Sequence, residues 1–533
     1  MAIHLERRKA VMARSKRLGH CVCDPRKGCP CDTLREHNIC PCAGEKLPVK
    51  TGAVPLTKHV RHAGCASKIG QADLLRILGG LPTVEDPRIL IGSAAGDDAG
   101  VYEVDSHCVL VQTVDVFTPC VDDPYLFGQI AAANSVSDVY AMGGRPITAL
   151  SIIGFPIDKL DGAIMEAILR GGLDKLAEAG CSLIGGHSIN DEEIKCGFAV
   201  TGLIDRNRVV TRDAPRPGDV LVLTKPLGTG MVCFAVQIGR LAQSALDLVG
   251  QSMATLNRDA AQLMLEHGAH ACTDVTGFGL AGHLVEMVRK GNVAAELDLS
   301  LLPVFGLAKS CLDQGILSGA IERNQEYTMA WIRTDEGASE QDLPILYDPQ
   351  TSGGLLISLP FARAEGFVEA MRERGHIGTA VIGRIVERET GPSEGRITVV
   401  NARVEHLLGD KETISMERYQ ACCDEQAVES CCDLGDGAQP AGKSQVASLF
   451  MDFMKEANRE GRVDLKTKKL IAIALSISRH CEPCLEIHLK GGLAMGLSRE
   501  EIDEAANLAV AFAGCPALMF YKDMLKKMGL TQA

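Results

Sequence analysis

Residues 109–144, VLVQTVDVFTPCVDDPYLFGQIAAANSVSDVYAMGG, join a strand pattern directly to a helix pattern, and they decide the fold class. Apolar side chains alternate from Val109 to Thr113, which is typical of a strand. A helix is expected from Pro124 to Met142, because Asp123 can cap it, proline fits its first turn and Gly143-Gly144 ends it. The mixture of strands and helices predicts an α+β domain.

A second α+β domain is predicted after Pro215-Arg216-Pro217-Gly218-Asp219, which reads as a loop. Its first strand would begin with Val220-Leu221-Val222-Leu223. Further on, the apolar periodicity is lost in a linker and then returns as a helical pattern, with Leu470, Ile473 and Ile477 on one face of a small all-α bundle. The expected parts of the chain are residues 1–48, 49–214, 215–410, 411–444 and 445–533.

The composition is that of a globular protein with an acidic balance. The 55 basic and 68 acidic residues give a formal net charge of -13. No basic block offsets this charge, which argues against a nucleic-acid or anionic-membrane partner. The N-terminus lacks the apolar stretch of an export signal and no later run approaches a membrane span, so a cytoplasmic location is expected. The 21 cysteines are then expected to serve metal, cluster or redox roles.

Aspartates recur at positions that suit magnesium and phosphate. Asn134 and Asp138 are four residues apart on the expected helix, so both side chains emerge on one face and can meet one magnesium-phosphate group. Asp98 and Asp115 are expected at the ends of strands, and Asp274 precedes a glycine-rich turn. An isolated aspartate is more often a cap or a turn residue, but the chain has no Walker A pattern. Several carboxylates with metal ions would therefore hold the phosphates.

A short loop, Gly64-Cys65-Ala66-Ser67-Lys68, adds a soft nucleophile to this set. Cys65 can carry a soft atom, and Lys68 can follow phosphoryl charge. Arg61 and His62 make the loop electropositive, which is expected to favour the thiolate. The combination predicts ATP-dependent phosphoryl transfer at a site that also needs a thiol.

In their order and in their residues, these motifs resemble those of the selenide, water dikinase family, from about Leu56 to about Leu408. The resemblance implies an α+β, two-domain core like that of aminoimidazole ribonucleotide synthetase. It also implies conversion of ATP, selenide and water to selenophosphate, AMP and phosphate, in a homodimer joined through the core. The implied magnesium ligands are Asp98, Asp138 and Asp274, and the residues implied to lie near the nucleotide are Lys68, Asp115, Asn134, Gly185, Gly186 and His187.

The same resemblance implies roles for the cysteine loop. Cys65 matches the position where the family has cysteine or selenocysteine, and Lys68 matches its essential lysine. Ser67 departs from members that have a second cysteine there.

Three Cys-x-Cys pairs lie near the N-terminus. This segment has too few large apolar residues to bury a core, so it needs a metal, a cluster or a neighbouring domain for stability. The last two pairs resemble the catalytic subunit of ferredoxin-thioredoxin reductase, which implies a thiol or ferredoxin-type electron donor. A zinc site is the alternative. The resemblance implies Cys21, Cys29, Cys31 and Cys40 as ligands of a [4Fe-4S] cluster, with Cys23 and Cys42 as a redox disulfide.

The C-terminal sequence Cys481-Glu482-Pro483-Cys484-Leu485-Glu486-Ile487-His488 resembles the alkylhydroperoxidase and carboxymuconolactone decarboxylase family. A C-x-x-C pair at the opening of a helix gains stabilisation of its thiolate from the helix dipole. Cys481 and Cys484 are therefore expected to be a redox pair, with His488 moving a proton. Lys469 occupies the position where family peroxidases often have a glutamate. The linker cysteines Cys422, Cys423, Cys431 and Cys432 are assigned no site.

Two alternatives remain at this point. One is another ATP-using enzyme of the aminoimidazole ribonucleotide synthetase superfamily, which would share the aspartates but not the need for Cys65 and Lys68. The other is an iron-sulfur or thiol electron-transfer protein whose middle region merely binds nucleotide. The match of residues 277–282 to G-x-G-x-x-G is a weak dinucleotide signal by itself.

Overall fold

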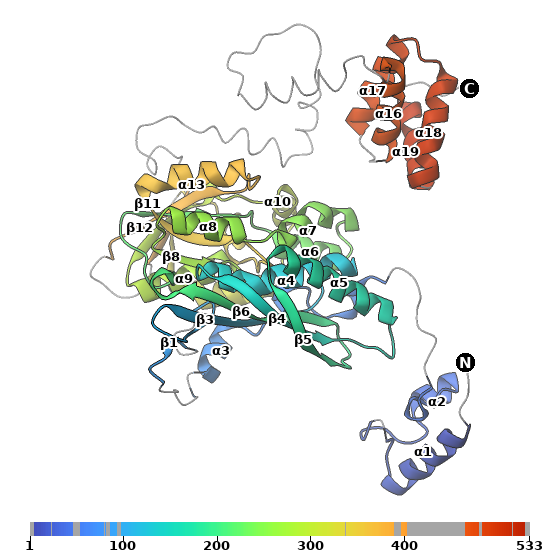
Figure 1. Ribbon diagram of the computed structural model, residues 1–533, viewed down its shortest axis with the longest axis horizontal. Coiled ribbons are helices and arrows are strands. Elements are labelled where there is room, and N and C mark those ends of the chain that lie inside the picture. The colour runs from blue at the N-terminus through green and yellow to red at the C-terminus, as the bar shows by residue number, and fades with distance from the viewer. Residues whose placement is uncertain are drawn as a thin grey trace. The chain divides into compact units, whose positions relative to one another are not determined.

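The computed structural model of the chain divides into two compact units, Met1–Thr413 and Ile414–Ala533 (Figure 1). Each unit is described by itself. The structure describes residues 5–22, 24–45, 54–78, 80, 86–92, 97–335, 337–388, 396–401, 464–478, 482–513 and 515–527.

The N-terminal segment is held together by an ion pair. Its helices are α1 (Leu5–Leu18) and α2 (Asp32–His37), followed by the 3-10 turn η1 (Pro41–Ala43). The guanidinium of Arg8 is buried and donates to both carboxylate oxygens of Glu45, with Nε 2.6 Å from Oε1. Glu45 in turn accepts the backbone N–H of Cys40 at 2.9 Å. This polar staple connects the first helix to the last cysteine turn, where a larger domain would use an apolar core.

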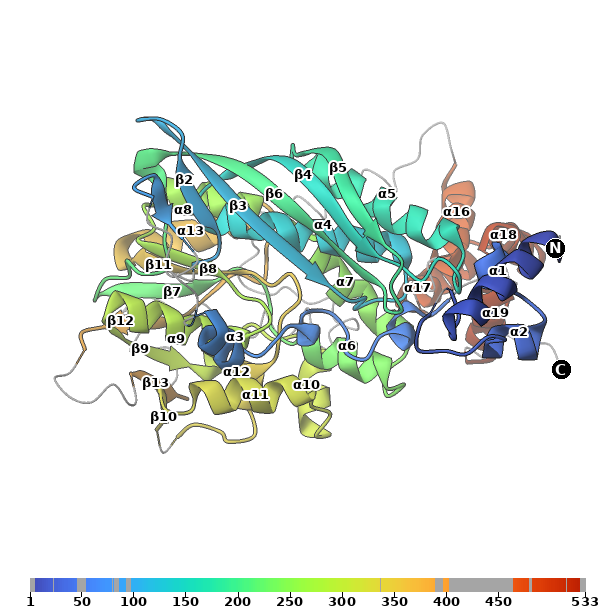
Figure 2. The same cartoon turned by 90° about the horizontal axis from the view of Figure 1, so that it is seen from below.

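The first domain of the core is a six-stranded sheet in the order β1-β2-β3-β6-β4-β5. Neighbouring strands are antiparallel except for the parallel pair β4 and β5. The broad face of this sheet is seen in Figure 2, with α4 running along it. Its strands are β1 (Ile89–Ile91), β2 (Gly100–Glu103), β3 (Cys108–Phe117), β4 (Arg145–Gly154), β5 (Ser182–Ile189) and β6 (Lys195–Asp205), and its helices are α3 (Gln71–Leu78), α4 (Pro124–Ala141) and α5 (Gly162–Glu178).

Helix α4 forms as the sequence predicts. The Asp123 carboxylate caps it by accepting the N–H of Leu126 at 2.6 Å, proline occupies its first turn, and Gly143 follows with φ of 80°. Two glycines then let α4 and α5 cross in backbone contact. A Cβ on Gly128 would overlap the carbonyl oxygen of Ile168, and one on Gly171 would overlap a backbone carbonyl of α4. The close crossing fixes the helix against the sheet and so fixes the depth of its polar residues.

The second domain is a seven-stranded sheet in the order β10-β13-β9-β12-β7-β11-β8. The predicted strand after the proline-rich loop is β7, and all five of its residues are buried. The strands are β7 (Asp219–Leu223), β8 (Ala271–Asp274), β9 (Ala294–Asp298), β10 (Ile332–Thr334), β11 (Leu355–Pro360), β12 (Ala380–Val386) and β13 (Ile397–Val400). The helices are α6 (Thr229–Gln237), α7 (Leu246–Ala254), α8 (Arg258–Glu266), α9 (Gly279–Gly291), α10 (Gly306–Asp313), α11 (Gly319–Thr328), α12 (Pro344–Tyr347) and α13 (Phe361–Glu373).

One continuous apolar core joins the two domains. Helix α4 packs against β3 and β6 of its own sheet and against α7 and β8 of the second domain. Polar residues on α4 therefore face strand β8 directly. Any site they form belongs to both domains.

The described residues of the second unit form helices, as predicted, and include no strand. Ile473 and Ile477 of the expected apolar face are fully buried in its core with Leu485 and Leu489. The expected linker 411–444 lies outside the described residues. Among the helices that are described, none is long and apolar enough to cross a membrane. The helices of this unit are α16 (Leu465–Ser478), α17 (Glu482–Ala494), α18 (Arg499–Ala513) and α19 (Cys515–Lys527).

Candidate active site

Three aspartates from distant parts of the sequence meet between the two domains. Asp98 precedes β2, Asp138 lies on α4 and Asp274 is the last residue of β8. One carboxylate oxygen of each lies within 4.8 Å of the others, and within the described ranges this is the one group of potential metal ligands that meets this limit. Magnesium prefers a few carboxylates and keeps other positions for water and phosphate oxygens. The structure brings the three predicted magnesium ligands together.

The charges of this cluster also call for a cation. Burial, with Asp274 and Asp97 nearby, raises the pKa of Asp98 to about 7, although Arg212 opposes the shift. Burial and the neighbouring carboxylates likewise raise the pKa of Asp138 well above its usual range, and burial raises that of Asp274. Oδ2 of Asp98 is buried and has no hydrogen-bond partner among the described residues. A bound divalent cation would satisfy that oxygen and relieve the repulsion, so the donor set fits magnesium.

Sequence reasoning missed the residues that hold these carboxylates in place. Arg212 pairs with Asp98 and, through Nε at 3.1 Å, with Asp97. The hydroxyl of Thr273 donates to Asp98 at 2.7 Å, and that of Thr113 donates to Asp138. No local motif marks them, since each lies on a different loop or strand. Only their partners, which lie far away in the sequence, reveal the role.

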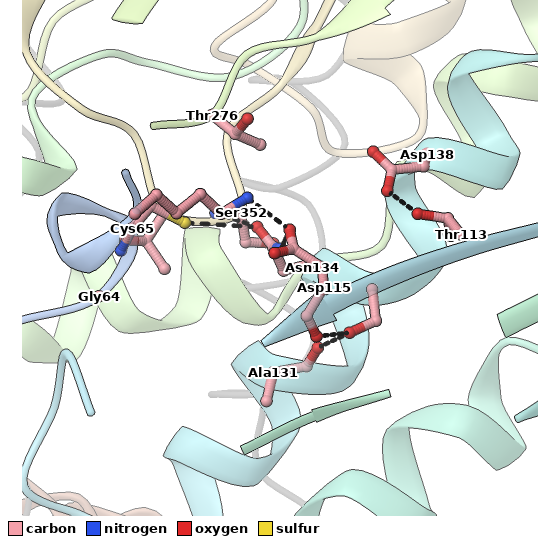
Figure 3. Close-up of polar contacts among 12 residues, drawn as sticks. Gly64, Cys65, Thr113, Asp115, Ala131, Asn134, Asp138, Thr276 and Ser352 are labelled. Carbon is pink, nitrogen blue, oxygen red and sulfur yellow. Dashed lines mark hydrogen bonds and ion pairs between the residues drawn. The ribbon is translucent and has the colours of Figure 1, made fainter. Parts of the chain in front are cut away.

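A second polar group lies beside the aspartates and centres on Asp115 (Figure 3). Lys68 Nζ lies 2.8 Å from Asp115 Oδ2, and the side-chain amide of Asn134 donates to the same oxygen. Oδ1 of Asn134 accepts the backbone N–H of Ser352 at 2.9 Å. Burial by itself would lower the pKa of Lys68, but Asp115 and Cys65 raise it above its usual value, so the ammonium stays charged. The group supplies a half-buried cation next to a magnesium-type site.

Two expectations about these residues need correction. Asp115 is the eighth residue of the ten in β3 and not at the end of a strand. Asn134 and Asp138 do share a face of α4, but they reach different groups, because Asn134 binds Asp115 whereas Asp138 joins the aspartate cluster. One helical turn separates the two residues. This distance places Asn134 beside Lys68 and Asp115, and Asp138 beside the other aspartates of the cluster.

Cys65 lies in the 3-10 turn η3 (Cys65–Ser67) and is 1% exposed. Its N–H donates to Thr351 Oγ1 at 3.1 Å, and its Sγ lies 4.0 Å from Asn134 Oδ1. A Cβ on Gly277 would lie 3.1 Å from the Cys65 carbonyl oxygen, so the glycine-rich turn after β8 closes over this loop. Cys65, Lys68 and Asn134 are brought together as predicted from the sequence.

The closed loop does not stabilise the expected thiolate form of Cys65. Burial raises the pKa of Cys65 to about 12, and the opposing effect of Lys68 is smaller. The prediction that basic neighbours favour the thiolate was wrong for this conformation, because loss of hydration outweighs one nearby cation. The Cys65 thiol is therefore protonated while the loop is closed.

The predicted glycine turn lies elsewhere. Gly185, Gly186 and His187 belong to β5, the edge strand, and are exposed. Two strands separate β5 from β3, which places this turn about 14 Å from the line of Asp115 by ordinary strand spacing. Within one chain these residues are not brought to the aspartates.

The N-terminal cysteines gather in part. Cys21, Cys31 and Cys40 are buried, Cys29 is half-buried, and Cys23 lies outside the described residues. Cys21 Sγ lies 3.4 Å from Sγ of Cys42, so this contact joins one expected cluster ligand to one expected redox cysteine.

The C-terminal motif is described only from Glu482, where α17 begins. Cys481 and the side chain of Cys484 lie outside the described residues. His488 Nδ1 lies 3.4 Å from Lys469 Nζ, and burial together with this lysine lowers the pKa of His488. A neutral imidazole can accept a proton from a thiol, and this role of His488 stays a prediction.

The stabilising effect of magnesium is expected to grow with pH. Because the pKa of Asp98 is raised from an unfolded value near 4 to about 7, the metal-free core loses stability as pH rises through this window. Magnesium binds the ionised carboxylates and removes that cost. The rise in melting temperature on adding magnesium should therefore be larger at about pH 8 than at about pH 6. An equal rise at both pH values would contradict the cluster as the binding site.

Comparison with known proteins places the chain among curated relatives. Family profiles match the AIR synthase related protein N-terminal domain at residues 96–204, the corresponding C-terminal domain at 216–393 and the carboxymuconolactone decarboxylase family at 444–526. These matches confirm the expected α+β two-domain core and the identity of the helical C-terminal region.

Selenide, water dikinase of Geobacter metallireducens is 47% identical over 337 residues, which is 63% of this chain and 98% of that protein. Selenide, water dikinase of Pelobacter propionicus is 43% identical over 63% of this chain and 96% of its own length. Thiamine monophosphate kinase of Aquifex aeolicus is a structural neighbour at 20% identity and a TM-score of 0.42, covering 62% of this chain and 97% of that one.

Proposed function

The chain belongs to the selenide, water dikinase family, and from that premise we propose that its core makes selenophosphate from ATP, selenide and water, releasing AMP and phosphate. The observation that carries the proposal is the meeting of the aspartate cluster with Cys65 and Lys68 at one domain boundary. A phosphoryl-transfer centre thereby lies next to a thiol that can hold a soft atom.

Asp98, Asp138 and Asp274 would hold magnesium, which supplies charge neutralisation for the phosphates when bound. The chain's own groups do the positioning. Lys68 is drawn from its ion pair with Asp115 toward phosphoryl oxygens, and Asn134 holds the oxygen that Lys68 leaves. The loop of residues 64–68 closes on the glycine-rich turn at Gly277 and excludes water from the reacting atoms.

The alternatives explain less. Another enzyme of the aminoimidazole ribonucleotide synthetase superfamily would have no need of a buried thiol 4.0 Å from Asn134 Oδ1. An electron-transfer protein with a passive nucleotide site would not need three clustered carboxylates whose pKa values are all raised.

Phosphorus NMR of the purified protein with ATP and magnesium, with and without selenide under anaerobic conditions, tests the proposal. A phosphorus signal split by a bonded selenium nucleus, together with AMP in equal amount, is expected only when selenide is present. ATP hydrolysis that ignores selenide would favour the superfamily alternative.

The parts of the chain outside the core complete the proposal. We propose that the chain divides into five parts at residues 48, 214, 410 and 444, and that it is located in the cytoplasm. We also propose a [4Fe-4S] cluster on the N-terminal cysteines. The donor set suits a cluster, because three of its four cysteines are buried and thiolate is the ligand that iron prefers. Visible absorbance with iron and zinc analysis of anaerobically purified protein distinguishes the cluster from the zinc alternative.

A homodimer through the open face of the first sheet is expected. Val114, Leu150 and Ile184 are 60%, 45% and 65% exposed there, and the strand register aligns Val114 and Leu150 with the same residue of β6. An apolar sheet face of this kind needs a partner. Leu150→Glu should convert the dimer to monomer in sedimentation velocity, whereas Ile377→Glu, at an exposed position of the second domain, should not. A monomeric parent protein would contradict the prediction.

Such a dimer would also bring the exposed residues Gly185, Gly186 and His187 of β5 in one copy to a second copy. Strand β5 lies far from the aspartates of its own chain. Gly185, Gly186 and His187 could therefore contact a nucleotide bound by the partner. The predicted nucleotide contacts of these three residues would then be made across the dimer.

The terminal thiol modules are expected to supply electrons for selenium. Cys481→Ser and Cys42→Ser should lower activity when selenium is supplied in oxidised, thiol-bound form, and the loss should disappear with strong reductant and free selenide. Tethering raises the concentration of donor thiols near the core to roughly millimolar. Cys108→Ser, on β3, serves as the control. Equal activity of parent and variants under both supplies would show that the modules serve another purpose.

A further inference from the structure

Ser352 has a backbone conformation that serine rarely adopts. Its φ is 50°, in the left-handed region where the Cβ of an ordinary residue is crowded. Among the described residues other than glycine, the two others with a positive φ are Asn38 and Asn292, and asparagine tolerates this region better. Glycine would fit position 352 without this strain, so the presence of a side chain has a cost.

The hydroxyl of Ser352 adds a second cost. Ser352 is 1% exposed, and its hydroxyl oxygen is buried without a hydrogen-bond partner among the described residues. A buried hydroxyl that makes no hydrogen bond destabilises the folded protein, and glycine or alanine would avoid this cost. A strained backbone and an unsatisfied polar group at one residue beside the candidate active site indicate that a ligand uses the hydroxyl.

Contacts on both sides hold the backbone of Ser352 in place. Its N–H donates to Asn134 Oδ1 at 2.9 Å, and Cys65 Sγ lies 4.0 Å from the same oxygen (Figure 3). Its carbonyl accepts from the buried Lys225 Nζ at 3.0 Å. Lys225 Nζ also donates to the Thr255 carbonyl at 2.7 Å. The neighbouring residues therefore fix the left-handed conformation of Ser352.

The chain on either side of Ser352 connects the thiol to the aspartate cluster. Thr351 Oγ1 accepts the N–H of Cys65 at 3.1 Å. Two residues after Ser352, the carbonyl of Gly354 accepts the N–H of Val275 at 2.9 Å. Val275 directly follows the aspartate that ends β8. Ser352 thus lies between the proposed selenium carrier and the strand end that carries one of the proposed magnesium ligands.

We propose that Ser352 is a further catalytic residue, whose hydroxyl donates a hydrogen bond to an oxygen of the phosphoryl group as this group passes from ATP to selenium. The inference rests on the proposed function and deepens it. A hydroxyl is a hard donor, so it suits an anionic phosphoryl oxygen better than it suits selenium. A donor that is already fixed in place stabilises the transition state because it needs no reorganisation during the reaction.

The transfer step balances without a proton moving to or from Ser352. Hydroselenide attacks phosphorus, a selenium–phosphorus bond forms, and the bond from phosphorus to the bridging oxygen of ATP breaks. The bridging oxygen leaves with the bonding electron pair, and the proton of hydroselenide stays on the product. Ser352 keeps its own proton and supplies only the hydrogen bond.

Two substitutions separate the hydroxyl from the backbone conformation. Ser352→Gly removes the hydroxyl and suits a positive φ, whereas Ser352→Ala removes the hydroxyl and keeps the strain. In both variants, kcat for selenophosphate formation from free selenide should fall about 100-fold in phosphorus NMR assays. ATP affinity, measured by calorimetric titration with magnesium, should stay at the parental value, because the hydrogen bond forms during the transfer. The Ser352→Gly protein should melt close to the temperature of the parent.

Ser318→Ala is the matched control. Ser318 is 6% exposed and its hydroxyl also lacks a partner among the described residues, but its φ is -84° and it precedes α11. The control should keep the parental kcat. A parental kcat in Ser352→Gly would overturn the inference, and so would a fall in kcat that comes with lower ATP affinity or a lower melting temperature. A parent protein that makes no selenophosphate from free selenide would instead overturn the proposed function.

Discussion

Cys65→Ser and Lys68→Ala are expected to lower selenophosphate formation about 100-fold or more while the protein remains folded. Serine is similar in size to Cys65 and fits the same position near Asn134. Its oxygen, however, does not bind a soft selenium atom as sulfur does. Alanine at position 68 removes the cation that lies 2.8 Å from Asp115 and that would follow the transferred phosphoryl group. The rate is measured by phosphorus NMR with free selenide.

The two variants should differ in a second readout. Loss of Lys68 leaves Asp115 buried without its cation, so Lys68→Ala should also weaken ATP binding, whereas Cys65→Ser should not. Ile69→Ala, at an exposed side chain of the same loop, is the control for loop damage and should retain activity. Parental rates in both active-site variants would show that the loop has no part in the chemistry.

Asp138→Asn is expected to weaken magnesium-dependent ATP binding about tenfold or more, and Asp98→Asn and Asp274→Asn should act in the same direction. Each change replaces a hard anionic oxygen of the cluster by a neutral amide. The measurement is calorimetric titration of ATP at several magnesium concentrations. Asp161→Asn, which keeps a good cap at the start of α5, is the matched control.

The same variants should gain stability without metal. Burial, and for Asp138 also the neighbouring carboxylates, raises the pKa values of the cluster, so removing one charge relieves that cost. The metal-free Asp138→Asn protein should therefore melt at or above the temperature of the parent. Lower stability combined with unchanged magnesium affinity would mean that the aspartates are structural.

Local sequence signals predicted the elements of the fold well. The cap at Asp123, the proline after it and the glycines at the end defined α4, because caps and turn residues act within a few positions of the chain. The strand at Val220 and the apolar face around Ile473 followed from periodicity for the same reason. The magnesium-type ligands were also predicted, since their motifs resemble those of a known family.

The sequence by itself therefore determined the elements, the fold class, the family and most members of the site. Tertiary structure alone decided how those members divide, placing Asn134 with Asp115 and Lys68 while Asp138 joins Asp98 and Asp274. It also decided that Cys65 is buried, with its pKa raised, and that Arg212 pairs with Asp98. The physical reason is that desolvation and charge coupling depend on neighbours brought together from residues far apart in the chain, and no local pattern records them.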